Sequence, residues 1–356
     1  MEIGIIGLPN SGKTTIFNAL TRSDTSTAAF SSGQLEVHTA VVDVPDTRVD
    51  RLSEMYHPKR TIYAQVTYND IAGLGKDAAK SGLSGPLLNA IAANEALMLV
   101  VRAFEDENVA HPDNSVDPLR DLVAMETDLI LNDMTVLDRR LERLAGTKNR
   151  GTPEERKRMA EEEALLQRLM AELETEVALR DVELSDAELK SLGGFGLLSL
   201  KPLLRVINGG DEQTEADFAE TLDANTLFLR GRLEAEIAQM DPEEATEFLG
   251  EFGITEPGLN RAIRYCFQML GLLSFFTVGD DEVRAWTVQR GALAPEAAGV
   301  IHSDLQKGFI RAETIAYNDL IELGTMAEAR KHGKLRLEGK EYAVADGDIL
   351  NIRFNI

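Results

Sequence analysis

Short apolar runs separated by turn residues dominate the first part of the chain. The first run ends at Gly7, and a glycine-rich loop then leads into a second apolar stretch over residues 16–20. Strand, glycine loop and helix in this order predict an α/β domain. Two of the further runs are almost wholly apolar, as expected for strands buried on both faces. The further strands are predicted at residues 40–44, 61–68, 97–101 and 203–207.

Between the last two of these strands, the apolar positions change to the spacing of helices. Charged residues fill the gaps, and the breaker-rich segment 146–153 separates two such stripes. This pattern predicts two amphipathic helices that form an antiparallel hairpin inserted into the α/β domain. We expect the stripes to pack mainly on each other, which leaves the tip and the outer faces available to a partner. The stripes consist of Ile130, Met134, Leu137, Leu141 and Leu144, and of Leu166, Leu169, Leu173 and Val177.

The composition changes again after about residue 272, where short strand-like pieces alternate with Gly and Asp. This predicts a small β-rich domain over residues 273–356. The α/β domain is then discontinuous, with residues 1–121 and 199–272, and the hairpin occupies residues 122–198. The strands expected in the C-terminal domain are residues 274–278, 283–287, 342–344 and 349–356.

Composition and charge narrow the function. The 356 residues include 37 Lys+Arg and 60 Asp+Glu, a net charge of −23, which argues against a protein that coats nucleic acid or binds DNA. A small basic patch on one domain remains compatible with this charge. The single cysteine, Cys266, cannot form an intramolecular disulfide, and there is no apolar run of about 18 residues to span a membrane. Because residues 1–7 resemble a strand and not a signal peptide, we expect a soluble cytoplasmic protein.

Residues 7–15 carry the strongest chemical signal. Gly7-x-x-x-x-Gly12-Lys13-Thr14 matches the phosphate-loop pattern at every fixed position, between a predicted strand and a predicted helix. The glycines let backbone N–H groups surround an anion. Lys13 is expected at the β- and γ-phosphates, and Thr14 at Mg²⁺. The predicted nucleotide-binding residues of the loop are Pro9, Asn10, Ser11, Gly12, Lys13, Thr14 and Thr15.

A second signal, Asp70-Ile71-Ala72-Gly73, closes a predicted strand. In phosphate-loop proteins an Asp here helps to hold Mg²⁺, and the Gly backbone approaches the γ-phosphate. Without the phosphate loop, the pattern would be an ordinary turn. Leu74 follows, where Ras-like switches use a glutamine to orient the attacking water, and leucine cannot do this.

The third signal follows the strand at residues 203–207. Asn208-x-x-Asp211 has the base-reading pattern of GTP-binding domains, in which the Asp accepts hydrogen bonds from guanine N1 and N2. An ordinary Asn-Gly-Gly turn is the alternative. Gly209 stands where a lysine usually follows the Asn, so the choice of base stays open.

Together these motifs resemble the YchF-type Obg-like ATPases of the translation-factor GTPase class. The resemblance spans the whole chain, and the order of its parts agrees. It implies a G domain with an inserted helical hairpin and a C-terminal TGS domain. It also implies Mg²⁺-dependent hydrolysis of a nucleoside triphosphate, often ATP, and association with ribosomes. The segments that carry it are residues 7–20, 70–74, 275–279, 282–287, 297–304, 307–313, 346–348 and 353–355.

The resemblance also implies a catalytic histidine in a loop before the hairpin, which corresponds here to His111. Three departures mark a divergent member. Gln34 stands where the family has a Mg²⁺-binding Thr, with Thr39 as a nearby alternative. The Gly-rich stretch after Asp70 is altered, and Asp211 replaces the family's usual Glu.

Three functions follow from these patterns. The first is a slow Mg²⁺-dependent ATPase or GTPase that regulates the translation apparatus, with Lys13 and His111 as its catalytic residues and ATP slightly ahead of GTP. The second is a nucleotide-binding scaffold with little or no hydrolysis. In the third, the TGS domain, with the hairpin as a further contact surface, acts as an adaptor for RNA or protein.

Overall fold

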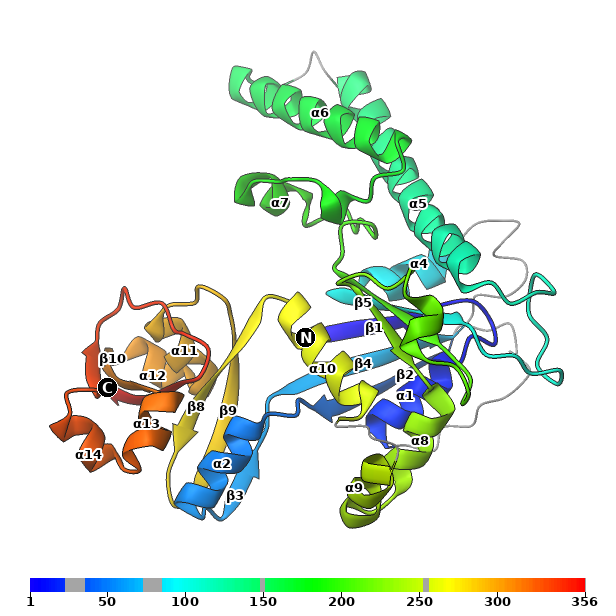
Figure 1. Cartoon of the computed structure of the whole chain (residues 1–356). Coiled ribbons are helices and arrows are strands. Elements are labelled where there is room, and N and C mark those ends of the chain that lie inside the picture. The colour runs from blue at the N-terminus through cyan, green and yellow to red at the C-terminus, as the bar shows by residue number, and fades with distance from the viewer. Residues whose placement is uncertain (23–35, 73–84, 148–150, 252–255, 356) are drawn as a thin grey trace. The chain divides into compact units, whose positions relative to one another are not determined.

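The computed structural model describes residues 1–22, 36–72, 85–147, 151–251 and 256–355 (Figure 1). The chain divides into two compact units. The first consists of Met1–Ala40 and Thr67–Leu259, and the second of Val41–Val66 and Asn260–Ile356.

A six-stranded sheet in the order β2-β4-β1-β5-β6-β7 forms the centre of the first unit. β1 lies parallel to both β4 and β5, and β5, β6 and β7 continue in parallel. β5 is buried along its whole length, as its unbroken apolar sequence predicts. The α/β fold is therefore confirmed. The strands are β1 (Glu2–Ile6), β2 (Glu36–Asp43), β4 (Gln65–Ala72), β5 (Ala96–Arg102), β6 (Leu203–Asn208) and β7 (Thr226–Leu229).

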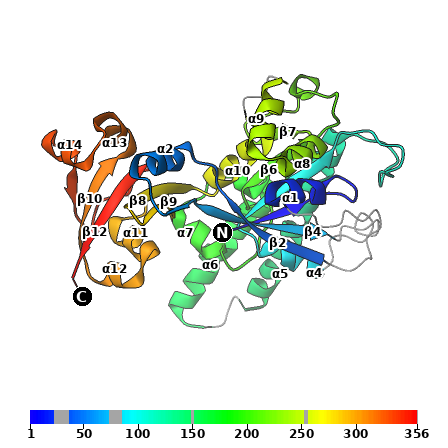
Figure 2. The ribbon, with the colours of Figure 1, turned by 90° about the horizontal axis from the view of Figure 1, so that it is seen from below.

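Helices flank this sheet in both views (Figures 1 and 2). Apolar side chains of β1, β5 and β6 pack with α4 and the first turns of α5 in a core whose members are almost fully buried. The helical elements are α1 (Lys13–Thr21), α4 (Gly85–Ala92), η2 (Glu215–Phe218), α8 (Gly231–Gln239), α9 (Pro242–Glu251) and α10 (Gly258–Met269), which crosses into the second unit.

The two predicted helices of the hairpin are α5 (Pro118–Thr147) and α6 (Pro153–Glu174). α6 begins with a capping box, in which Thr152 and Glu155 satisfy each other's backbone N–H groups, and Pro153 occupies the first turn. The apolar stripes pack on each other as expected. Val177 lies beyond the end of α6, because Glu176 adopts a positive φ of 63° that ends the helical path.

Polar contacts tie α5 to the segment that returns from the hairpin towards β6. The buried carboxylate of Asp133 on α5 accepts hydrogen bonds from the backbone N–H groups of Leu198 (2.8 Å) and Ser199 (2.7 Å). Burial raises the pKa of Asp133, and these hydrogen bonds oppose that rise. The return segment contains η1 (Leu179–Asp181) and α7 (Asp186–Leu192).

The second unit has its own six-stranded sheet, in the order β11-β10-β12-β8-β9-β3. One of its cores includes Phe275 on β8 and Ala297 on α11. The elements are α2 (Thr47–Tyr56), β3 (Arg60–Ile62), β8 (Leu272–Val278), β9 (Glu282–Gln289), α11 (Ala294–Ile301), α12 (Ser303–Lys307), β10 (Phe309–Ala316), α13 (Tyr317–Leu323), α14 (Met326–Lys331), β11 (Arg336–Glu338) and β12 (Asp348–Phe354).

Two features differ from the sequence-based expectation. Residues 41–66, which we expected in the α/β domain, pack with the C-terminal strands, because β3 pairs in parallel with β9 and α2 packs on both β8 and β9. Residues 342–344 form no strand, and Ala343 makes only an isolated bridge to Leu293.

No helix in the described part of the chain is both long and apolar enough to cross a membrane.

Candidate functional site

The phosphate loop joins the end of β1 to the start of α1, and its shape depends on glycine at both ends. Gly7 (φ 153°) and Gly12 (φ 90°) have positive φ values that other residues rarely adopt. A Cβ at Gly7 would overlap the Val100 carbonyl oxygen, and one at Gly12 would overlap Asn208 Nδ2. The loop therefore lies directly against the ends of β5 and β6, as the phosphate-loop pattern requires.

Lys13 opens α1 and is 8% exposed. Its Nζ donates a hydrogen bond to the Leu8 carbonyl oxygen at 2.9 Å, which folds the side chain back over the loop. Burial lowers the pKa of Lys13 to about 8, and the nearby Asp70 carboxylate partly opposes this. The ammonium group is thus held at the loop with little solvent around it, where an anionic ligand would stabilise its charge.

Thr14 and Asp70 meet at the position expected for Mg²⁺. Thr14 Oγ1 donates to Asp70 Oδ2 at 2.7 Å, which leaves the hydroxyl lone pairs free. Asp70 is fully buried, and its Oδ1 has no hydrogen-bond partner among the described residues. No group of three or more His, Cys, Asp or Glu in the described ranges could hold a metal. A hydroxyl beside one buried carboxylate with an unpartnered oxygen fits an ion that takes most of its ligands from phosphate and water, as Mg²⁺ does.

Other predicted residues lie around this point. Pro9, Asn10 and Thr15 are half-buried on the loop and the first turn of α1. Gln34, Gly73 and Leu74 lie outside the described residues. The hydroxyl of Thr39, the alternative to Gln34, donates to Asn69 Oδ1 at 2.6 Å and does not meet Asp70 in the described contacts.

Asn208 holds the phosphate loop and the start of α8 together. Its Nδ2 donates to the Ser11 carbonyl oxygen at 3.0 Å, and its Oδ1 accepts from the Gly231 N–H at 2.9 Å. The side chain is almost fully buried. Asn208 therefore fixes the loop from behind and positions the segment that follows it.

Gly209 and Asp211 continue from Asn208 towards the surface. A Cβ at Gly209 would overlap the Phe228 ring, so this position has no room for the lysine of the common pattern. Asp211 is exposed in the turn that follows.

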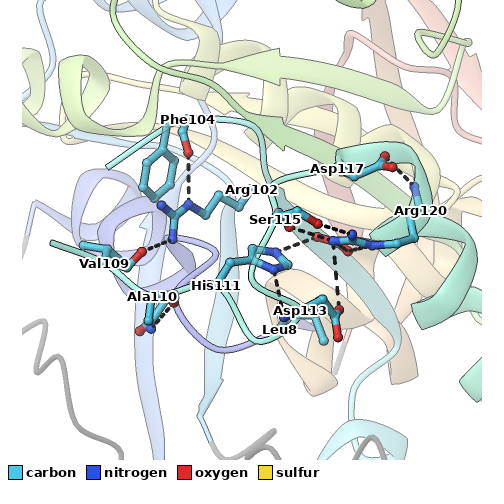
Figure 3. A network of polar contacts seen from close by, with 12 residues as sticks. Leu8, Arg102, Phe104, Val109, Ala110, His111, Asp113, Ser115, Asp117 and Arg120 are labelled. Atoms are coloured by element: carbon cyan, nitrogen blue, oxygen red, sulfur yellow. Dashed lines mark hydrogen bonds and ion pairs between the residues drawn. The ribbon is translucent and has the colours of Figure 1, made fainter. Parts of the chain in front are cut away.

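Arg102 and Phe104, which were not predicted from the sequence, shape the neighbouring loop (Figure 3). The buried guanidinium of Arg102 donates to the carbonyl oxygens of Phe104 (3.0 Å), Asp106 (3.2 Å) and Val109 (2.8 Å), and lies 4.5 Å from the Phe104 ring centroid. Burial lowers the pKa of Arg102. A Cβ at Gly12 would lie 3.7 Å from the Phe104 ring. The sequence feature that could have indicated Arg102 is the position of an arginine directly after a wholly apolar run.

His111 lies on the same loop, which contacts the phosphate loop through Asn10 Nδ2 and the Ala110 carbonyl oxygen at 2.9 Å (Figure 3). Its ring is buried. Nδ1 accepts from the Asp113 N–H at 3.2 Å, so the proton resides on Nε2, which donates to Asp121 Oδ2 at 2.9 Å. Arg120 donates twice to the other oxygen of Asp121. Both ring nitrogens are therefore engaged within the protein.

The strand–loop–helix unit, the Thr14–Asp70 contact and the Asn208 bridge define a phosphate-loop nucleoside triphosphatase of the G-domain class. A family model described as a 50S ribosome-binding GTPase matches residues 2–133. The model YchF-GTPase_C, described as a protein of unknown function (DUF933), matches residues 272–355.

Similar proteins match along the whole chain. The chain is 39% identical to the ribosome-binding ATPase YchF of Bacillus subtilis (strain 168), with 100% of both proteins covered. It is 40% identical to the protein of the same name in Escherichia coli O157:H7, covering 100% of this chain and 99% of the relative. The structure of the Schizosaccharomyces pombe YchF GTPase superposes with a TM-score of 0.87 at 33% identity, covering 99% of this chain and 97% of that one. The chain therefore belongs to the YchF family, which confirms the resemblance.

Proposed function

We propose that the protein binds and slowly hydrolyses a purine nucleoside triphosphate with Mg²⁺ and acts as a regulatory NTPase on cytoplasmic ribosomes. The observation that carries this proposal is the buried constellation of Lys13, Thr14 and Asp70 on a complete phosphate loop. The relatives named ribosome-binding ATPase support the ribosome as partner.

The chain's own residues provide positioning and charge. Lys13 would move from the Leu8 carbonyl oxygen to the β- and γ-phosphates, where its low exposure strengthens the attraction. Thr14 would supply its hydroxyl oxygen to Mg²⁺, and Asp70 would hold a metal-bound water through the unpartnered Oδ1. Bound Mg²⁺ neutralises charge on the phosphates. Backbone N–H groups of the loop and the start of α1 add partial positive charge.

The base would lie beyond Gly12, between the Phe104 loop and the turn after Asn208. Phe104 is close to both Gly12 and Gly210, and its ring offers a face for stacking. Asp211 is an exposed carboxylate in this turn. An Asp there suits guanine, whereas the relatives are named ATPases. We give the family more weight than the single residue Asp211, and therefore propose that the protein prefers ATP slightly over GTP.

We propose His111 as the group that orients water or transfers a proton. In the geometry described above, its ring is held by Asp121 and Asp113. One of these hydrogen bonds must break before the ring can orient water or transfer a proton at the γ-phosphate. This requirement fits slow hydrolysis in the absence of a partner.

The test measures phosphate release by wild type and Lys13→Ala, with ATP or GTP and with or without 70S ribosomes. Lys190→Ala is the matched control, because Lys190 is an exposed lysine on α7. We expect Lys13→Ala to abolish release and to weaken triphosphate binding sharply, and the control to behave as wild type. Unchanged affinity of Lys13→Ala for a non-hydrolysable triphosphate would refute the site.

The second candidate is a nucleotide-binding scaffold with little hydrolysis, which the engaged ring of His111 favours. The same assay separates the two functions. Tight triphosphate binding without phosphate release, even with ribosomes, would support the scaffold. Labelled ATP competed with GTP would settle the base preference.

A further inference from the structure

The two units differ sharply in charge. The first unit contains 21 Lys+Arg and 43 Asp+Glu, while the second contains 16 and 17, so almost all of the net charge of −23 belongs to the first. Against this acidic background, the distal end of the hairpin is locally basic. Its described residues, 139–147 and 151–158, include six basic and three acidic side chains.

Most of these cations are exposed and make no ion pair among the described residues. This holds for Arg139 and Arg143 on α5, and for Arg156 and Arg158 on α6. Lys157 is 79% exposed and, within the described part of the hairpin, forms an ion pair only with Glu161, at 3.8 Å. We call these five residues the basic tip. Its cations are open to an external anion.

Arginines elsewhere in the first unit are engaged. Arg180 and Arg205 both pair with the half-buried Glu126, and Arg168 pairs with Glu188 at 2.7 Å. Among the three acidic residues of the distal end, Glu155 is held in the capping box of α6. The lack of ion pairs at the four arginines of the tip is therefore a local feature and not a general property of the hairpin.

The length of α5 also separates the tip from the acidic residues near the sheet. α5 is a continuous helix from Pro118, and Arg143 lies 25 residues further on, which at 1.5 Å per residue is about 37 Å. Figure 1 shows α6 beside the distal part of α5, where Arg140 pairs with Glu162. Since the Debye length at physiological salt is about 8 Å, the acidic groups near the sheet are largely screened at the tip.

We propose that the basic tip is a docking surface for the phosphate backbone of RNA. Arginines on two neighbouring helices, with no acidic partner, suit an anion that presents charge at regular intervals. This deepens the proposed function, since it assigns the ribosome contact to RNA and to one end of the hairpin. It does not depend on nucleotide hydrolysis.

The test uses the full chain with the double substitution Arg143→Gln and Arg158→Gln. The control is Arg168→Gln with Lys190→Gln, which removes the same charge from α6 and α7 away from the tip. The probes are a fluorescein-labelled RNA duplex and purified 70S ribosomes, titrated between about 50 and 200 mM salt. Phosphate release without ribosomes is measured in parallel and should equal wild type in both variants.

Each phosphate contact adds about 0.9 to the slope of log affinity against log salt. We expect the tip variant to lower this slope by about 2 on RNA and to weaken ribosome binding, while the control leaves both unchanged. Equal slopes for wild type and tip variant, or no RNA binding by wild type, would overturn the proposal. Lost ribosome binding with unchanged RNA binding would point to an acidic protein and would also overturn it. If wild type releases no phosphate but the slope falls, the hydrolysis proposal fails and this one stands.

Discussion

At Lys13, burial acts against the charge that a phosphate loop uses. Its pKa of about 8 means that the free protein loses this proton above pH 8, although an exposed lysine would keep it. The ammonium form binds the phosphates, so binding above pH 8 must take up a proton. We expect proton uptake at pH 9 but not at pH 7, with affinity falling about tenfold per pH unit above 8.

Calorimetry in two buffers of different ionisation enthalpy measures this uptake directly. Lys13→Arg is the control, because arginine stays charged at these pH values and should show no uptake. Equal proton uptake at both pH values in wild type would mean that Lys13 keeps its charge in the free protein.

The role of His111 is tested by His111→Ala. We expect hydrolysis to slow by about 10²–10⁴-fold, as is usual for a positioned acid, base or orienting group, with little change in triphosphate affinity. Single-turnover phosphate release and equilibrium binding measure the two effects. Because the ring is buried, thermal unfolding with bound nucleotide must accompany them. A folded variant that hydrolyses the triphosphate at the wild-type rate would rule out this role for His111. Lys13 and the metal would then be the only proposed catalytic groups.

Asp211→Glu tests base recognition. The longer side chain restores the family's usual residue, so we expect the ATP:GTP affinity ratio to rise. A mismatched base would leave polar groups unpaired at a cost of about 1–3 kcal/mol, which is enough for a ten- to hundredfold change. Titration calorimetry gives the ratio. The same ratio for both proteins would assign recognition to backbone groups around Asn208 and Gly209.

At the scale of elements, Asn208 joins the phosphate loop, the end of β6 and the start of α8. Asn208→Ala removes both hydrogen bonds and leaves the Ser11 carbonyl oxygen and the Gly231 N–H buried without this partner. We expect a loss of about 1–3 kcal/mol in the free energy of unfolding for each unpaired group, with weaker nucleotide binding.

Denaturant unfolding measures this loss, and Asp211→Ala is the control because its side chain is exposed in the same turn. If Asn208→Ala changed nucleotide affinity but not stability, Asn208 would contact the base and would not hold the loop.

The sequence was sufficient for elements that are defined locally. β1, β5 and β6 are buried apolar runs, and the stripes of α5 and α6 follow helical spacing until Glu176 ends the second one. The phosphate loop, Asp70 and Asn208 could be placed because their spacing from strand ends is fixed. The bridge made by Asn208 depends on atoms far apart in sequence, so no local pattern indicates it. The contacts of Arg102 are local, but an arginine after an apolar run does not by itself specify which carbonyl oxygens it will bind.

At the scale of the whole molecule, the assignment of residues 41–66 was the least predictable feature. The predicted strand at residues 61–68 contains two strands, and β3 pairs with β9 from the far end of the chain. Such pairing depends on contacts between distant segments, whereas the prediction followed chain order. The domain boundary at residue 272 therefore remains a proposal. It can be tested by asking whether α2 and β3 stay folded without the C-terminal strands.

A chain ending at Gly271 would lose β8 and β9, which cover the fully buried side chains of α2, Val49 and Leu52. Exposing each would cost about 1.5–3 kcal/mol, so we expect this truncated protein to aggregate.

The Val44 N–H donates to the Ala64 carbonyl oxygen at 2.7 Å, so an Asn-Gly turn can replace residues 45–63. We expect the chain with both changes to stay soluble and bind nucleotide. Size-exclusion chromatography and thermal unfolding compare the two proteins. If the simple truncation were equally soluble and stable, residues 41–66 would not need the C-terminal strands, and the predicted boundary would describe an independent domain.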